Sequence, residues 1–418
     1  MSRQNPVTLI TPVKFSKQAS LFEFLYQLRI DLEKDIHESF ENIGTIHYAR
    51  WLVIDDTISP GTSSMGDMPK LVYSANIDGD PGKHIEDLCT IAGDVIDKIY
   101  DCCEGYPSSA SPEMKIAYLK KWAVPVSAFY IGSPGRSLPQ IQQESQLRNF
   151  IRNFLDSKNW NGRSSQQVHA EIQKAVFANP EFEWAKKPAP TPSINWPGLV
   201  LMGIVLLLLL PVILVWILVV QFKYERHDSY FTLKRSELDE NAIRKLETYE
   251  DLDFQNQFSQ LVVMKAGKVR LITYNSMMLF ARVLIRNLFV KGKLMGIPSI
   301  HFARWVLFDN KKRVLFFSNF DGSWQQYLGD FIDKSGWGLT GIFSNTTNFP
   351  KTKFLIMGGA YDEEHFLAWS RHSEIQTQIW YNAYPQLSIK NINNNSIIRN
   401  GLSKQLSAAQ AATFLKLL

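Results

Sequence analysis

Cysteine is scarce in this chain of 418 residues. The three cysteines, Cys89, Cys102 and Cys103, all lie in the first half, and no CxxC or CxxCH motif occurs. An odd number that includes an adjacent pair makes a poor disulfide framework, so a reducing compartment is expected for that half. The missing motifs exclude a thioredoxin-like centre, a zinc ribbon and c-type haem attachment.

Other motifs of chemistry and targeting are also missing. The chain has no P-loop, no Rossmann glycine pattern, no GxSxG, no HxxxH and no HxH. These absences disfavour nucleotide binding, serine-hydrolase chemistry and a clustered-histidine metal site. The N-terminus lacks the apolar core of a secretory signal. The net charge is only +5 and no run of five Lys or Arg occurs, so nucleic acid is not expected as a partner.

The chain does contain a long internal repeat. Residues 45–80 include TIHYARWLVIDD and KLVYSANIDGD, and residues 299–324 read SIHFARWVLFDNKKRVLFFSNFDGSW. The spacing from Gly79 to Pro107 and from Gly322 to Pro350 is 28 residues in both copies. Order, motif and spacing together indicate a duplicated unit. The matched pairs are His47 with His301, Arg50 with Arg304, Trp51 with Trp305, Asn76 with Asn319, and Asp78 with Asp321.

Hydrophobic periodicity predicts the same order of elements, β-α-β-β-α-β, in both halves. This is the ferredoxin-like unit. In the first half we expect strands at 6–14, 46–54, 71–77 and 122–131, helices at 20–40 and 82–103, and a polar loop at 55–70. In the second half we expect a first strand supplied by 259–265 and 268–272, further strands at 301–308, 313–319 and 353–358, and helices at 274–290 and 323–344. The extensions are a helix from Leu138, a helix at 361–375, an extended aromatic stretch at 378–387, a polar loop at 391–395 and a terminal helix at 403–418.

The expected fold class is therefore α+β, with two ferredoxin-like repeats. Each sheet would have one bare face, and burying the two bare faces together would make an intramolecular pseudo-dimer, an α+β barrel. The expected divisions are 1–157 for the first repeat with its helix, 158–195 for a linker, 196–222 for a membrane segment, 223–258 for a connection, 259–390 for the second repeat, and 391–418 for a tail.

The segment Trp196–Phe222 has no charged residue and follows a Pro-rich stretch at 188–192. It is long enough to cross a bilayer, although a buried soluble helix is the alternative. Pairing of the halves within one chain favours a same-side arrangement, with the segment bent at Pro211 into a monotopic hairpin. A bitopic anchor with pairing between chains remains open. We expect a membrane protein with its soluble parts on the cytoplasmic side. Ser276–Val290 reads as a core helix or as a second membrane contact.

The repeated polar residues are the candidates for chemistry. Arg304 with aromatic neighbours, and Asn319 and Asp321 at the end of the adjacent strand, could bind an anionic group or tune a proton donor. Arg50 and Asp78 are their first-half equivalents. The alternative is that Arg and Asp pair to close the hairpin in both halves.

The segment FDGSW, with Asp321 and Gly322, resembles the GxxDG element of dye-decolourising peroxidases, although Ser318 stands at the first glycine. That element's aspartate serves peroxide cleavage beside haem, and these enzymes, like chlorite dismutases, pair two ferredoxin-like units. The doubled layout with a central anchor also resembles an uncharacterised family of membrane-anchored proteins. The resemblance to the peroxidases implies haem as a cofactor, which needs an axial histidine. The candidates are His372, His365, His301 and His47.

Two hypotheses from different classes follow. The first is a membrane-attached oxidoreductase of the haem peroxidase or monooxygenase kind, acting on an apolar or lipid-like substrate. The second is a non-catalytic membrane-associated binding or scaffold module, in which the repeated polar residues hold the hairpins. Membrane lipid, an apolar small molecule and a second copy of the chain are the expected partners.

Overall fold

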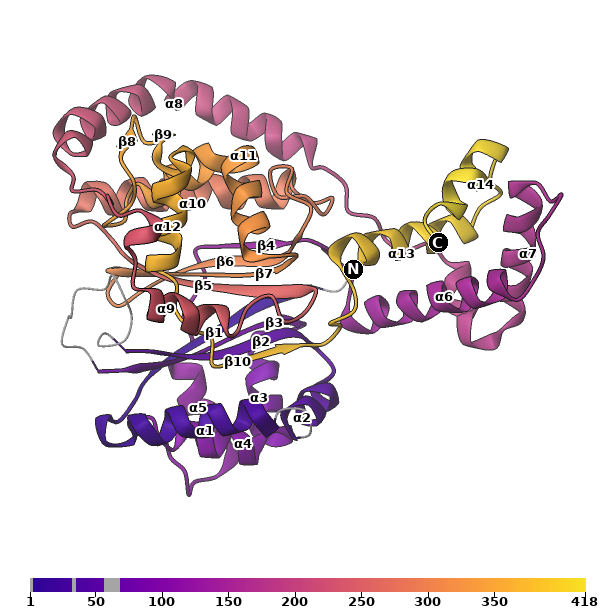
Figure 1. Ribbon diagram of the computed structural model, residues 1–418, viewed down its shortest axis with the longest axis horizontal. Coiled ribbons are helices and arrows are strands. Elements are labelled where there is room, and N and C mark those ends of the chain that lie inside the picture. Colours follow the sequence, from indigo (N-terminus) through magenta and orange to yellow (C-terminus); the bar gives the residue numbers. More distant parts are fainter. Residues whose placement is uncertain (1–2, 32–34, 56–67) are drawn as a thin grey trace.

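The computed structural model describes residues 3–31, 35–55 and 68–418. Figure 1 shows two sheets stacked face to face, with helices on the outer side of each and a helical lobe projecting to one side. Both sheets have four antiparallel strands. The predicted α+β class is therefore confirmed. The predicted loop at 55–70 lies largely outside the described residues.

The first sheet has the strand order β1-β3-β2-β10. Every residue of its strand β2 is buried, because helices cover one face and the second sheet covers the other. Asp80 begins the helix α3 by accepting the Lys83 N–H, and Pro81 takes the first helical position. The strands are β1 Gln4–Pro12, β2 Ile46–Ile54, β3 Lys70–Asp78 and β10 Ile379–Asn382, and the helices are α1 Gln18–Asp31, α2 Asp35–Ile43, α3 Pro81–Ile91, α4 Gly93–Tyr100 and α5 Pro112–Lys121.

The second sheet has the order β4-β6-β7-β5. Its central pair of strands shows the same irregularity as the first sheet: the register shifts between Ile300 and Phe302, and between Ile46 and Tyr48 in the first sheet. The strands are β4 Ala128–Ile131, β5 Gln255–Val263, β6 Ile300–Phe308 and β7 Arg313–Asp321, and the helices are α10 Lys268–Asn287, α11 Trp324–Phe343 and α12 Glu363–His372.

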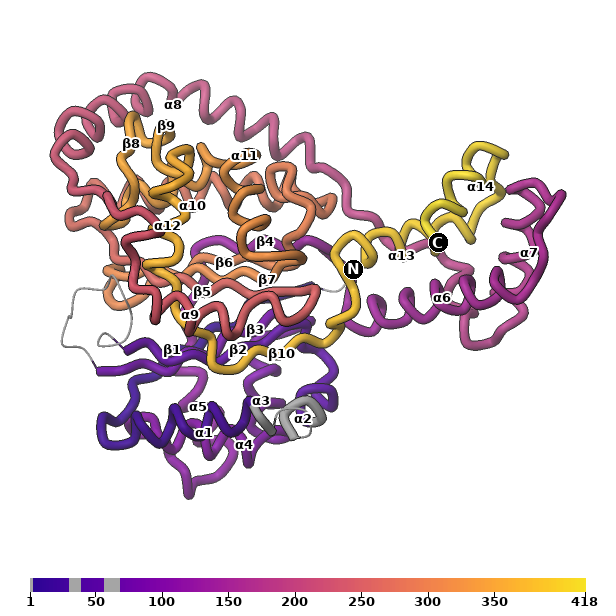
Figure 2. Tube along the Cα trace, viewed as in Figure 1, coloured from indigo at the N-terminus to yellow at the C-terminus, as the bar shows by residue number. Residues whose placement is uncertain are grey.

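The short edge strands are exchanged between the sheets. Residues 122–124 run beside β1, where Ile10 donates to the Trp122 carbonyl, and the chain then crosses so that β4 pairs with β6. In the second half Ile375 donates to the Ser259 carbonyl of β5, and the chain crosses back so that β10 pairs with β2. Figure 2 shows the crossing as a yellow segment beside the indigo and violet strands.

Several predicted elements are therefore corrected. The fourth strand at 122–131 is divided between the two sheets. The strand at 353–358 is instead a small hairpin of β8 Thr352–Lys353 and β9 Met357–Gly358, and β10 from the aromatic stretch takes the sheet position. Residues 268–272 belong to α10 and not to a strand, because Gly267 ends the extended backbone. The expected helices at 20–40 and 82–103 are each two helices, with residues 32–34 outside the description.

The lobe combines the extensions of both halves. Its core joins Leu147 and Val168 from the first half to Ile398 and Phe414 from the second. The predicted polar loop at 391–395 is wrong, since Ser388 caps a helix in which Ile389, Ile392 and Ile398 are buried, and packing overrides the poor helix propensity of asparagine. The helices are α6 Leu138–Asp156, α7 Ser165–Ala178, α13 Ile389–Leu402 and α14 Ala408–Leu415.

The central apolar segment is the helix α8, Trp196–Lys223. Among the described residues it is the one helix long and apolar enough to cross a membrane. The helix continues through Pro211, so the predicted hairpin at that residue is wrong. Figure 1 shows α8 arching over α10 and α11 on the outer side of the second unit. Between α8 and β5 lie α9 Glu240–Glu247 and two short 3-10 helices, Glu225–His227 and Arg235–Glu237.

Candidate functional site

The predicted polar residues meet at the seam, by which we mean His47, Arg50, Asn76 and Asp78 of the first sheet and His301, Arg304, Asn319 and Asp321 of the second. Side chains alternate along a strand, so Arg50 on β2 points away from its own helices and toward the opposite sheet. Its Nη1 donates to Gln257 Oε1 at 3.0 Å and to the Phe258 carbonyl at 2.9 Å. Its Nη2 donates to Asn319 Oδ1 at 2.5 Å. Arg50 thus ties the first sheet to β5 and β7.

Arg304 makes the reciprocal connection. From β6 it reaches into the first sheet, where Nη1 donates to the Val7 carbonyl at 2.7 Å and Nη2 to the Ala75 carbonyl at 2.6 Å. Nη2 also donates to Asn76 Oδ1. The two sheets are therefore crosslinked twice by the same residue types, once in each direction.

Both guanidinium groups are buried without a carboxylate partner among the described residues. Each is 2 % exposed. Burial lowers the pKa of Arg50 and of Arg304 to about 9, so both stay protonated at neutral pH. Carbonyl, amide and hydroxyl oxygens compensate the lost hydration. The alternative in which Arg and Asp pair to close each hairpin is therefore wrong, because the arginines bond to the opposite sheet.

The aspartates pair with histidines. Asp321 Oδ1 lies 2.7 Å from His301 Nε2, and its Oδ2 accepts the Ile389 N–H at the start of α13 at 2.8 Å. Asp78 repeats this arrangement: Oδ1 lies 3.3 Å from His47 Nε2, and Oδ2 accepts the Leu138 N–H of α6 at 2.6 Å. A carboxylate at a helix N-terminus is electrostatically favourable. Each aspartate thus joins a sheet to a helix of the lobe.

Two tyrosines lie between the His–Asp pairs. Tyr384 Oη is 3.1 Å from His47 Nδ1, and Tyr48 donates to Gln255 Oε1 at 2.5 Å. The ring of Tyr48 lies 5.5 Å from that of His301 and 5.3 Å from that of Tyr384. Burial is the main reason that the pKa of both tyrosines is raised well above its ordinary value. Both therefore stay protonated and act as hydrogen-bonding groups.

The seam contains groups that could transfer protons, but these groups are buried and a substrate cannot reach them. A His–Asp pair is the arrangement used to orient a proton-transfer group. However, His47 is 0 % and His301 1 % exposed, and the paired carboxylates are about 10 % exposed or less. Substrate or cofactor would have to displace these packed side chains. The geometry favours a structural role for the seam.

The other two histidine candidates lie apart from the seam on α12. His365 Nδ1 is 2.9 Å from Asp362 Oδ1, one turn earlier on the chain. The His372 ring is 5.3 Å from the ring of Phe231, and burial lowers its pKa. The structure therefore brings two of the four proposed haem ligands together and separates the other two from them. Haem binding stays a prediction.

A further buried ionic cluster escaped the sequence analysis. Arg371 Nη1 donates to Glu250 at 2.7 Å and to Glu374 at 3.0 Å, and its guanidinium lies 3.7 Å from the centre of the Trp324 ring. Burial and the neighbouring Glu250 raise the pKa of Glu374 well above its ordinary value. Arg371 and Glu374 are three residues apart, but nothing in the sequence indicates that Glu250 joins them.

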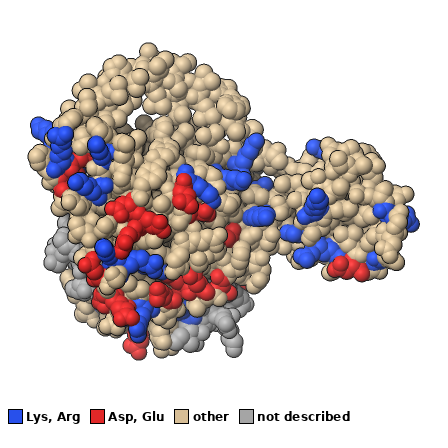
Figure 3. Space-filling view, turned by 45° about the horizontal axis from the view of Figure 1, so that its top comes forward, with Lys and Arg blue, Asp and Glu red and all other residues tan. Residues whose placement is uncertain are grey.

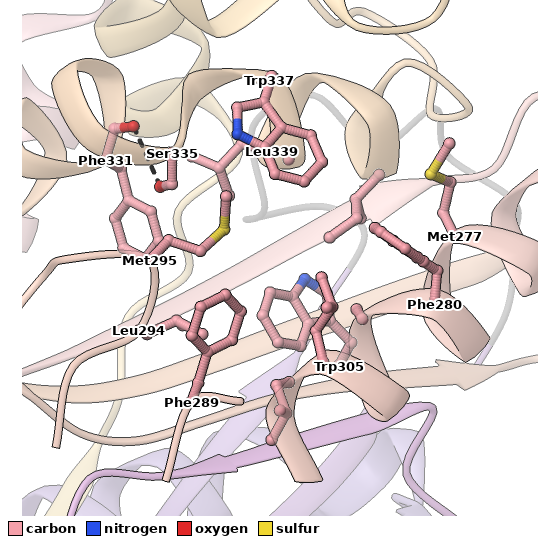
Figure 4. A pocket seen from close by; sticks show the side chains of 15 residues that line it. Met277, Phe280, Phe289, Leu294, Met295, Trp305, Phe331, Ser335, Trp337 and Leu339 are labelled. Atoms are coloured by element: carbon pink, nitrogen blue, oxygen red, sulfur yellow. Dashed lines mark hydrogen bonds between the residues drawn. The ribbon is translucent and has the colours of Figure 1, made fainter. Parts of the chain in front are cut away.

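The second unit also contains an apolar cavity, shown in Figure 4, between α10, α11 and the outer face of β6. The cavity has a volume of about 60 Å³ and is partly open to solvent. Met277, Phe280, Met295, Trp305 and Trp337 are among its lining residues. Methionine and aromatic side chains of this kind suit an adaptable apolar site.

Comparison of the chain with protein-family models, with curated proteins and with solved structures found no match.

Proposed function

We propose that this protein is a non-catalytic, membrane-associated binding and scaffold module, in which two ferredoxin-like units close on one another as an internal pseudo-dimer. The observation that carries the proposal is the position of α8. This helix has no charged residue before Lys223, and it lies along the outer side of the second unit with most of its surface uncovered.

The exposed area of α8 is too apolar for water. Leu207 and Leu208 are 70 % and 74 % exposed, and Val212 is 63 % exposed. In Figure 3 the surface at the top of the view, over α8, shows no Lys, Arg, Asp or Glu. Leaving apolar surface in water costs about 25 cal/mol per Å², and large exposed apolar patches mark membrane or partner contacts. The apolar character of α8 on all sides favours lipid.

Both ends of α8 are tied to the second unit. At its start Asn195 donates through Nδ2 to Asn287 Oδ1 at 2.8 Å, and Gly198 allows this close approach, because a Cβ there would lie 2.6 Å from Asn287 Oδ1. Near its end Trp216 Nε1 donates to Thr273 Oγ1 at 2.9 Å. A spanning helix would break one of these attachments. We therefore place α8 in the plane of the membrane, with both units on the same side, and the bitopic anchor is the competing arrangement.

The doubled plan supports the pseudo-dimer. The two sheets share a strand order, a register shift and exchanged edge strands. The repeated arginines, asparagines and aspartates are occupied in holding sheet to sheet and sheet to lobe. Their engagement favours the scaffold over the oxidoreductase, whose chemistry would need Arg304, Asn319 and Asp321 open to a ligand. A Soret band in protein purified with haem supplied would revive the oxidoreductase hypothesis.

Flotation with phosphatidylcholine vesicles tests membrane attachment. The full chain should float with the vesicles, and the double variant Leu208→Glu with Val212→Glu should stay in the soluble or aggregated fraction. Each charge placed in the apolar layer costs about 2.5–3.5 kcal/mol. The control Ile397→Glu, on the lobe where Ile397 is 51 % exposed, should float like the parent. A double variant that floats normally contradicts the proposal.

A further inference from the structure

The cavity of the second unit opens toward α8. Helical spacing puts Thr273, Met277, Phe280, Leu284 and Asn287 on one face of α10, since they lie four, three, four and three residues apart. The outer two of these residues accept hydrogen bonds from Trp216 of α8 and from its N-cap residue Asn195. The three between them line the cavity and are only partly buried. The open side of the cavity therefore faces the helix that we place in the membrane.

One unpartnered polar atom faces into this apolar space. Trp305 on β6 is 3 % exposed, and its indole Nε1–H has no hydrogen-bond partner among the residues that the structure describes. Figure 4 shows that nitrogen on the side of the ring that faces the cavity. A buried donor without an acceptor costs about 1–3 kcal/mol. An occupant that supplies one acceptor would remove that cost.

Water fits this donor poorly. A buried water needs two to four polar partners. Of the other two polar side chains in the lining, Ser335 already donates its hydroxyl to the Phe331 carbonyl at 3.1 Å, and Trp337 is 39 % exposed. An anionic acceptor would be buried without a countercharge among the lining residues. The chemistry therefore points to an apolar molecule with a single neutral oxygen.

We propose that the cavity is a lipid site, which takes the end of a hydrocarbon chain that carries one neutral oxygen acceptor, an alcohol, ester or ketone, while the rest of the chain lies in the membrane beside α8. The apolar body contacts Met277, Phe280 and Met295, and the oxygen accepts from Trp305 Nε1. This site rests on the proposed membrane association, because α8 determines which phase the cavity opens to.

Photolabelling of the full chain in phosphatidylcholine vesicles tests the site. The probes are hexadecan-1-ol and hexadecane, each carrying a diazirine in the chain, and adducts are mapped by mass spectrometry. With the alcohol we expect adducts on the peptides of Met277 and Met295. Ala281→Trp, which fills the cavity, should lower these adducts at least about tenfold. Leu279→Trp on the exposed face of α10 should leave them unchanged.

The matched tryptophans test the role of the indole N–H. Trp305→Phe should lower labelling by the alcohol about two- to tenfold, the effect of one hydrogen bond, and should leave labelling by hexadecane unchanged. Trp51→Phe, the equivalent change in the first unit, should alter neither. Equal loss with both probes, or no loss with either, overturns the assignment of Trp305.

Competition covers the case in which Ala281→Trp fails to fold. Unlabelled hexadecan-1-ol should displace the adducts at Met277 and Met295 in the parent protein and leave adducts on α8 unchanged. Adducts confined to α8, or undisplaced, overturn the lipid site. Flotation of the same samples separates the two proposals: a chain that floats without cavity adducts loses only the lipid site. If the chain does not float, the proposed function fails, and the same labelling in detergent micelles decides the site.

Discussion

The two units of the molecule share a framework and differ in what covers it. In the first unit the ring of Phe40 stacks on Trp51 with the centroids 5.5 Å apart, and Tyr73 packs against it at 4.6 Å. In the second unit Phe316 packs against Trp305 at 4.8 Å, but the other side of this indole borders the cavity. The space beside the matched tryptophan is thus filled by Phe40 in the first unit and left open in the second unit.

In our proposal this difference separates the residues that hold the fold from those that serve the function. Residues present in both copies, above all Arg50 with Arg304 and Asp78 with Asp321, hold the seam. Features present in one copy, α8 and the cavity, belong to the side of the second unit that we propose to contact the membrane. A repeated polar motif is therefore a poor guide to an active site when both copies use it in the same way.

The arginine crosslinks should give the largest effect. Arg50→Met and Arg304→Met should each lower the free energy of unfolding by about 3–5 kcal/mol, because several buried carbonyl and amide oxygens lose their donor. Thermal unfolding in detergent followed by circular dichroism measures this. Arg244→Met, at an exposed ion pair on α9, is the control and should change little. If one of these two substitutions left the free energy of unfolding unchanged, the two arginines would not be equivalent.

The aspartates should give a smaller and equally matched effect. Asp78→Asn and Asp321→Asn should each cost about 1–2 kcal/mol, since an amide replaces the charge at a helix N-terminus and beside a histidine. The same unfolding assay measures both. An Asp321→Asn variant that keeps full stability while losing a measurable activity would favour the oxidoreductase.

The smallest expected effect is a pH dependence of stability that comes from the first unit alone. Burial lowers the pKa of His84, whose Nε2 lies 2.9 Å from Tyr73 Oη, to about 3. The repeat has Tyr327 at this position. Below pH 6.5 the unfolded chain binds a proton that the folded chain refuses, so stability falls as the pH falls, by about 1 kcal/mol between pH 6.5 and 5.5. His84→Tyr should reduce this slope, and an unchanged slope would assign it to other groups.

The sequence predicts the repeat and most of its strands because the core pattern is local. It does not predict the exchange of β4 and β10, since four-residue strands such as Ile379–Asn382 have no signal for which sheet they join. The repeat predicts the residues of the seam but not their partners, because Arg50 bonds to residues more than 200 positions away. The cavity exists because no side chain packs against one side of the Trp305 ring. No pattern in the sequence predicts this missing contact.

The central claim is that α8 lies along the second unit with both units on one side of the membrane. Single cysteines introduced as Lys158→Cys before α8 and Lys245→Cys after it, both at exposed positions, can be labelled in sealed vesicles with a membrane-impermeant maleimide. Our account predicts that both sites react, or both are protected, in a given orientation. Labelling of one site with protection of the other would show a helix that spans the bilayer and would contradict it.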